Sequence, residues 1–186
     1  MYHIPVLAKE SIEALQIEPN GIYVDATFGG GGHSRLILEQ LGEKGRLFGF
    51  DQDQDAWQNA LDDQRFSLVQ GNFRHLKRFM RLYGVKKIDG ILADLGVSSH
   101  QFDKAERGFS YRFQGDLDMR MNQAEELTAA KVLNTYNESY LQQLFSSYGE
   151  VRNAKTLARA IVEARQVSAF LTMNDFMAVS DPLIKI

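Results

Sequence analysis

Ile22-Tyr-Val-Asp-Ala-Thr-Phe-Gly-Gly-Gly-Gly-His-Ser34, with Phe50-Asp51 one crossover later, is the stretch that decides the fold of this chain. Residues 22–24 are β-branched or aromatic, which is typical of a buried strand. The four glycines let the backbone turn sharply and approach a ligand closely, and a helix is predicted directly after them. A second strand then ends in a carboxylate. This βαβ unit predicts an adenosine-containing cofactor, whose ribose hydroxyls would donate hydrogen bonds to Asp51.

Two cofactors fit such a unit. The dinucleotide fingerprint G-x-G-x-x-G is incomplete, because counting from Gly29 puts Ser34 in the place of the third glycine. NAD needs a helix N-terminus that is free to face its pyrophosphate. S-adenosylmethionine (SAM) has no phosphate, so its turn accepts a bulky polar residue such as His33. The turn therefore favours SAM, and a nicotinamide-dependent dehydrogenase is the alternative that competition between the two cofactors would separate.

Composition narrows the setting of the chain. At 186 residues, 44% of them hydrophobic, we expect one globular domain, or one domain with a small insertion. The absence of cysteine excludes disulfides and Cys-based zinc sites, and His3, His75 and His100 have no ligand spacing, so we predict no metal. No apolar run suits a signal peptide or a membrane span, so a cytoplasmic enzyme without membrane contact is expected. The net charge of −3 argues against a protein that coats nucleic acid through bulk charge.

The first half continues as alternating helices and strands. A helix is predicted over residues 53–62 and strands over residues 65–69 and 88–95, the last nearly all apolar, as in a strand covered on both faces. Four strands joined by crossovers predict a parallel, doubly wound sheet with its ligand at the carboxyl ends of the strands. A basic stretch runs from Arg74 to Lys87. We favour a helix with a solvated cationic face there, and contact with RNA phosphates is the alternative.

Asp94-Leu-Gly-Val-Ser-Ser-His-Gln101 follows the fourth predicted strand, at the place where such sheets put their chemistry. The apolar residues before Asp94 deliver its carboxylate to that edge from a buried strand. Gly96 permits close backbone approach, and the following serines and Gln101 supply hydrogen-bonding groups. A turn that merely ends the strand is the alternative, and a functional loop is favoured because of its position.

Several blocks together resemble a known family, the bacterial 16S ribosomal RNA cytosine-N4 methyltransferases. The blocks run in order over essentially the whole chain: His3-Ile-Pro-Val-Leu7, the glycine turn, Asp94-Leu-Gly-Val-Ser-Ser99, Glu106-Arg-Gly-Phe-Ser110, Asp116-Leu-Asp-Met-Arg-Met121 and Ala158-Arg-Ala-Ile-Val-Glu163. The resemblance implies a Rossmann-like enzyme that uses SAM to methylate the exocyclic amine of a cytosine in the decoding region of the small ribosomal subunit. It implies SAM contacts at Gly31, Gly32, His33, Asp51, Phe73, Asp94 and Gln101.

Each implied contact has a physical interpretation. Gly31 and Gly32 would leave room for the methionine and ribose parts of SAM. Phe73 would pack on the adenine, or else be a core phenylalanine. His33 would bond the cofactor, or only cap the following helix. Gln101 would hold the polar tail of the cofactor or the target amine.

Asp94 is the candidate catalytic residue. A cytosine amine is a poor nucleophile because its lone pair is delocalised, so transfer needs in-line alignment and an acceptor that removes a proton. Asp94 is the best candidate for that acceptor, and a cofactor-binding role is the alternative. A DNA amino-methyltransferase would carry a proline and an aromatic residue in this segment, and both are absent here.

The second half has a different pattern. Residues 1–101 are predicted to be the SAM-binding half, and residues 102–186 a loop followed by a helical insertion that recognises substrate. The loop mixes aromatics with Arg107, Arg112 and Arg120, which suits RNA contact, and a loop pinned by its own aromatics is equally expected. Helices are predicted over residues 129–133, 140–148 and 154–165. Thr172-Met-Asn-Asp175 predicts a capping box at the start of a further helix.

One departure from the family pattern concerns the end of the chain. The family returns from its helical insertion to finish the sheet and carries a Ser-Phe/Tyr-His-Ser segment, whereas this sequence ends at Ile186 without it. We expect truncation, and the alternatives are an incompletely represented gene and a homodimer that covers the apolar edge left at the fourth strand. A non-catalytic module that binds SAM or the ribosome is therefore the alternative function.

Overall fold

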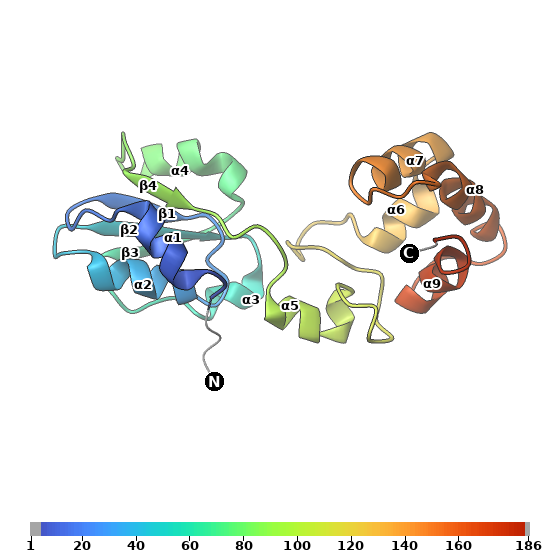
Figure 1. Cartoon of the computed structure of the whole chain (residues 1–186), viewed down its shortest axis with the longest axis horizontal. Coiled ribbons are helices and arrows are strands. Elements are labelled where there is room, and N and C mark those ends of the chain that lie inside the picture. The colour runs from blue at the N-terminus through green and yellow to red at the C-terminus, as the bar shows by residue number, and fades with distance from the viewer. Residues whose placement is uncertain (1–4, 185–186) are drawn as a thin grey trace. The chain divides into compact units, whose positions relative to one another are not determined.

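The computed structural model describes residues 5–184. The chain divides into two compact units, Met1–Gly96 and Val97–Ile186, each with its own core (Figure 1). The boundary expected from the sequence, between residues 101 and 102, falls inside helix α5 (Ser99–Asp103). His3, which belongs to the first sequence block, lies outside the described residues.

The first unit is an α/β sheet. Its four strands are all parallel and lie in the order β3-β2-β1-β4, which confirms the predicted parallel, doubly wound architecture. Its elements are, in chain order, α1 (Ala8–Leu15), β1 (Ile22–Asp25), α2 (Gly32–Gln40), β2 (Arg46–Asp51), α3 (Gln54–Trp57), β3 (Phe66–Gln70), η1 (Phe73–His75), α4 (Leu76–Leu82) and β4 (Gly90–Leu92).

Helices cover both faces of this sheet because successive strand residues point to opposite sides. On one face, Tyr23 and Leu47 pack with Ile37 of α2 and Ile12 of α1. On the other face, Val24, Phe48 and Phe50 pack against Met80 of α4. Val69 and Val85 complete this second core. Two apolar layers therefore hold the sheet and fix the edge at which its strands end.

Two elements are shorter than the sequence predicted. The strand expected over residues 88–95 is paired only from Gly90 to Leu92, and the helix expected over residues 53–62 ends at Trp57. The fourth strand is an edge, as predicted, because it pairs with β1 alone in the sheet. It is not covered on both faces, since the Ile91 side chain is 48% exposed. The pairing of β4 stops at Leu92 because its partner strand β1 ends at Asp25. The length of an apolar run does not predict where the neighbouring strand ends.

The second unit is helical. Its core is formed by α6 (Ala129–Thr135), α7 (Glu138–Ser147), α8 (Ala154–Ala164) and α9 (Met173–Ser180), which meet around Leu141, Leu157 and Ile161. The capping box predicted at Thr172 and Asp175 is confirmed. Tyr148, the last residue of the helix predicted over residues 140–148, is 88% exposed, and α7 ends one residue before it.

The loop before α6 is held by polar contacts. Arg107, in the short helix η2 (Ala105–Arg107), is buried, and its Nη2 donates a hydrogen bond to the carbonyl of Arg120 (2.9 Å). Arg120 is itself paired with Asp118 (2.6 Å). Arg107 therefore stabilises the loop, and the expectation that it contacts RNA is wrong for this side chain. Arg112 and Tyr111 are exposed, so the expectation stands as a prediction for them.

Candidate functional site

The candidate site lies at the carboxyl edge of the sheet. The strands are parallel and in register, with Asp25 beside Gly49 and Leu92, and Asp51 beside Gln70. The loops that leave these strands therefore meet at one edge, as expected for ligand sites of such sheets. They carry the glycine turn, Asp51, Phe73 and Asp94, which are four of the features that the sequence singled out.

Asp51 anchors the glycine turn. Its Oδ2 accepts a hydrogen bond from the backbone N–H of Gly29 (2.8 Å), and its Oδ1 accepts one from Asp53 (2.9 Å). Burial raises the pKa of Asp51 above its usual value, while the hydrogen bonds from Asp53 and Gly29 oppose that shift. The carboxylate that was predicted to bind the ribose thus also fixes the loop on which the ligand would lie.

The four glycines have different reasons to be glycine. Gly29 and Gly31 have φ of 52° and 73°, which disfavours other residues. A Cβ on Gly32 would lie 2.5 Å from Cγ of Pro5, so packing against the N-terminal segment requires glycine there whatever the ligand. A Cβ on Gly30 would meet no atom within 4 Å, so this side of the turn faces free space. The sequence analysis named Gly31 and Gly32 and not Gly30, and the contacts of Gly31 and Gly32 with a ligand stay predictions.

Asp25 is a second carboxyl group that the sequence analysis did not assign. It is fully buried, and it accepts hydrogen bonds from Ser34 Oγ (2.7 Å) and from the backbone N–H of Thr27 (3.1 Å). Burial raises the pKa of Asp25, and the Ser34 hydroxyl opposes that shift. The acid that ends the first strand therefore ties the end of β1 to α2. Its signal in the sequence was the same as that of Asp51: an acid directly after an apolar strand.

His33 joins α2 to the N-terminal segment. Its ring is buried, and Nε2 lies 3.2 Å from the carbonyl oxygen of Val6, which can only accept a hydrogen bond. The N-cap of α2 is Gly31, with no side-chain cap, so the alternative that His33 caps the helix is wrong. Contact between His33 and a cofactor stays a prediction.

Asp94 and Phe73 are both exposed at the carboxyl edge. The backbone N–H of Asp94 donates to Thr27 Oγ1 (2.7 Å), which ties the end of β4 to the loop after β1. The Phe73 ring is 41% exposed, so the alternative that it is a core phenylalanine is wrong. Asn72 Nδ2 donates to Gln52 Oε1 (2.9 Å) and links the loops after β3 and β2. Hydrogen bonds between the loops thus fix the backbone beside an exposed carboxylate and an exposed ring.

Gln101 belongs to the second unit, where it has a local structural role. Its backbone N–H donates to Ser98 Oγ (3.2 Å), and its side-chain oxygen accepts from the Ser98 N–H (3.0 Å). These bonds form the capping box of α5, and the side chain is buried. The predicted contact between Gln101 and SAM therefore stays a prediction.

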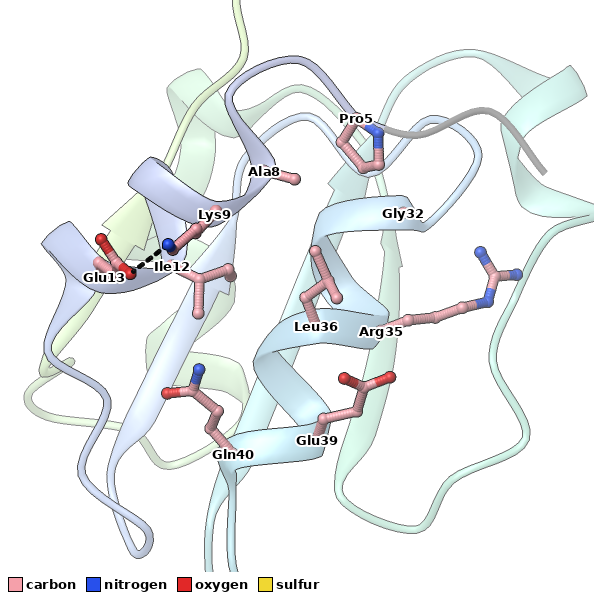
Figure 2. Close-up of a pocket in the computed structure, with 10 residues that line it drawn as sticks. All are labelled: Pro5, Ala8, Lys9, Ile12, Glu13, Gly32, Arg35, Leu36, Glu39 and Gln40. Carbon is pink, nitrogen blue, oxygen red and sulfur yellow. Dashed lines mark ion pairs between the residues drawn. The ribbon is translucent and has the colours of Figure 1, made fainter.

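A cavity of about 570 Å³ lies elsewhere in the first unit, between α1 and α2. Figure 2 shows Ile12 and Leu36 lining it from the two helices, with the ion pair between Lys9 and Glu13 (3.8 Å) at its side. Asp51, Phe73 and Asp94 are absent from its lining, so this cavity is not the candidate site. In residues 5–184, no three His, Asp or Glu side chains are grouped so that they could hold a metal ion.

Fold and site define the class of protein. A parallel sheet in the order 3-2-1-4, with a glycine turn after its first strand and an acid after its second, is a Rossmann-like fold. The chain belongs to the MraW methylase family, whose family model matches residues 1–184. This confirms the resemblance found in the sequence.

Relatives of named function support the same assignment. The chain is 57% identical over 173 residues to ribosomal RNA small subunit methyltransferase H of Flavobacterium psychrophilum, covering 93% of this chain and 60% of that protein. It is 56% identical over 183 residues to the protein of the same name from Phocaeicola vulgatus, covering 98% of this chain and 60% of the relative. The chain therefore spans about 60% of the length of these relatives. Across the part of the chain that the structure describes, none of the helices has the length and apolar character needed to cross a membrane.

Proposed function

We propose that this chain forms the SAM-binding part of an enzyme that methylates the N4 amine of a cytosine in the decoding region of 16S rRNA, in the cytoplasm. The observation that carries the proposal is the set of hydrogen bonds that joins the loops at the carboxyl edge. There Asp51 accepts a hydrogen bond from Gly29, and Thr27 of the same loop accepts one from the backbone of Asp94, so the loop after β1 is joined to the ends of both β2 and β4. Membership of a methylase family and relatives named for small-subunit rRNA support this reading.

The residues at this edge fit SAM by their chemistry. Asp51 offers carboxylate oxygens to ribose hydroxyls, and exposed Phe73 offers a ring face to adenine. Gly30 leaves its outer side open for the part of SAM nearest the turn. When bound, SAM supplies the methyl group on a sulfonium. We further propose that His33 and Gln101 contribute to this binding, as do Gly31 and Gly32 through the shape of the turn.

Asp94 is proposed to accept the proton of the cytosine amine. Its carboxylate is exposed at the edge, while its backbone is fixed by Thr27. An exposed carboxylate on a fixed backbone can approach an incoming amine, which a buried carboxyl such as Asp25 cannot do. Accepting a hydrogen bond from the amine localises the nitrogen lone pair and prepares it for in-line attack.

The test separates transfer from binding. Asp94→Asn keeps the size of the side chain but removes the proton acceptor, so methyl transfer from labelled SAM to undermethylated small subunits should fall about 100- to 10,000-fold. Calorimetric titration should show SAM affinity unchanged within about threefold. Asp62→Asn, the same change at an exposed position, is the matched control.

Parallel loss of binding and transfer would reduce Asp94 to a cofactor ligand. A folded wild-type chain that binds SAM yet transfers no methyl group would favour the alternative function, a SAM-binding or ribosome-binding module. Binding of NAD in competition with SAM would contradict the cofactor assignment itself.

A further inference from the structure

Positive charge in this chain is concentrated in one short segment. Residues 71–88 contain six of the 21 Lys and Arg residues and none of the 24 Asp and Glu residues. The rest of the chain therefore holds 15 cations against 24 acids, a net charge of −9, while this segment carries +6. Such segregation produces a local positive field on an otherwise acidic molecule.

Three of these cations lie on α4 and the other three flank it in the chain. Leu76, Phe79 and Met80 face inward and pack on the sheet, so the remaining positions of the helix face solvent. We call the exposed cations that result the α4 basic surface: Arg74, Lys77, Arg78, Arg81, Lys86 and Lys87. Lys77 and Arg81 are four residues apart, so they are neighbours along the helix.

A groove runs beside this surface. A cavity of about 570 Å³ lies between α4 and residues 84–88, and four of the six cations line it: Lys77, Arg81, Lys86 and Lys87. Its floor is apolar, with Met80 and Val85 buried beneath it. The groove is therefore a concave site with cationic walls, whereas an ordinary solvated helix face is convex.

Little within the protein neutralises these charges. Among residues 5–184, the one ion pair that reaches the α4 basic surface joins Lys87 and Asp89, at 3.7 Å. Like charges four residues apart repel one another, and cations near the start of a helix oppose its dipole. An external polyanion would relieve both effects.

We infer that the α4 basic surface binds the phosphate backbone of the RNA substrate. The surface begins at Arg74, directly after Phe73, and so starts at the carboxyl edge where the cofactor is proposed to lie. From there the cations follow α4 and end at Lys86 and Lys87 across the groove. Contacts to phosphate fix position without reading sequence, so this surface orients RNA while other groups select the base. The inference rests on the proposed function for the identity of the RNA.

The test is the salt dependence of RNA binding. A variant with Lys77→Gln, Arg81→Gln and Lys86→Gln removes three groove cations. The control variant, with Lys9→Gln, Lys44→Gln and Lys131→Gln, removes the same charge from exposed positions, two of which are paired with glutamates. Binding of a labelled single-stranded oligoribonucleotide is followed by fluorescence anisotropy at several KCl concentrations.

Each phosphate contact makes the plot of log affinity against log salt steeper, so the loss of three contacts should make the slope of the groove variant shallower by about 2. A fourfold rise in salt should then weaken RNA binding by wild type about 16-fold more than binding by the groove variant. The control should keep the wild-type slope, and both variants should keep wild-type SAM affinity, because none of the six changes lies at the carboxyl edge.

Equal slopes in the two variants would overturn the inference, because bulk charge would then explain RNA binding. An unchanged slope with a lower melting temperature would overturn it as well, and would assign the groove to packing against protein. Failure of the wild-type chain to bind SAM would count against the proposed function while leaving the salt slope, and hence this inference, separately measurable.

Discussion

Replacement of Asp51 by asparagine tests the site most sharply, because this carboxylate is proposed to serve both the loop and the ligand. In the structure it accepts two backbone hydrogen bonds, from Gly29 at 2.8 Å and from Asp53 at 2.9 Å. An asparagine amide keeps one acceptor oxygen and turns its NH₂ group toward the other backbone N–H. One charge-assisted hydrogen bond is lost, and two donors then face each other.

The expected loss of stability follows from these contacts. A hydrogen bond to a charged group contributes about 1.5–3 kcal/mol. Part of this is offset, because burial raises the pKa of Asp51 and the neutral amide avoids that desolvation cost. We therefore expect Asp51→Asn to lower the free energy of unfolding of the first unit by about 1–2 kcal/mol. For a unit of this size, that corresponds to a melting temperature lower by roughly 4–16 °C.

The effect on the cofactor is expected to be separate and additional. Loss of the charged acceptor for the ribose hydroxyls should weaken SAM binding by about 10- to 150-fold. Calorimetric melting and SAM titration measure the two effects on the same sample, with Asp62→Asn as the control for an exposed aspartate. A melting temperature equal to that of the control would refute the anchoring role. SAM affinity equal to that of the control would refute the ribose contact.

Three further predictions concern the same edge. Gly30→Ala should leave the melting temperature near that of wild type but weaken SAM binding, whereas Gly32→Ala, whose Cβ would meet Pro5, should cost about 1–3 kcal/mol in thermal unfolding. Burial raises the pKa of Asp25 above 3.8, so its ionisation lowers stability as the pH rises above that value. In melts between about pH 4 and 7, Asp25→Asn should therefore show a smaller fall of melting temperature with rising pH than wild type, and an identical fall would contradict this. Thr27→Val removes the hydroxyl that accepts from the Asp94 N–H, so it should slow methyl transfer more than it weakens SAM binding, and Thr27→Ser should restore the rate.

The sequence predicted the sheet and its edge well because their signals are local. An apolar, β-branched run followed directly by an acid marks the end of a buried strand, and this pattern placed Asp51 correctly at the end of β2. The capping box at Thr172 was equally local, since both of its residues lie within one helical turn. These features depend on neighbours in sequence, so they can be seen without the fold.

The errors concern residues whose surroundings come from distant parts of the chain. For Gly32 the sequence offered only a ligand as the reason for glycine, whereas Pro5 also excludes a Cβ there. Arg107 looked like a free cation, but the fold brings the carbonyl of Arg120 to it. Tyr148 fits the helical period of α7, but the helix ends before it. In each case a tertiary contact or a helix end overrides the pattern, and periodicity carries no information about either.

The aspartates that end or follow β1, β2 and β4 lie at different depths, and depth limits what each can do. Asp25 ends β1 and is fully buried, and its hydrogen bonds serve the fold. Asp51 ends β2, is partly exposed, and can serve both loop and ligand. Asp94 follows the edge strand β4 and is exposed. Of these three carboxylates, Asp94 is the one whose exposure fits its proposed role as proton acceptor.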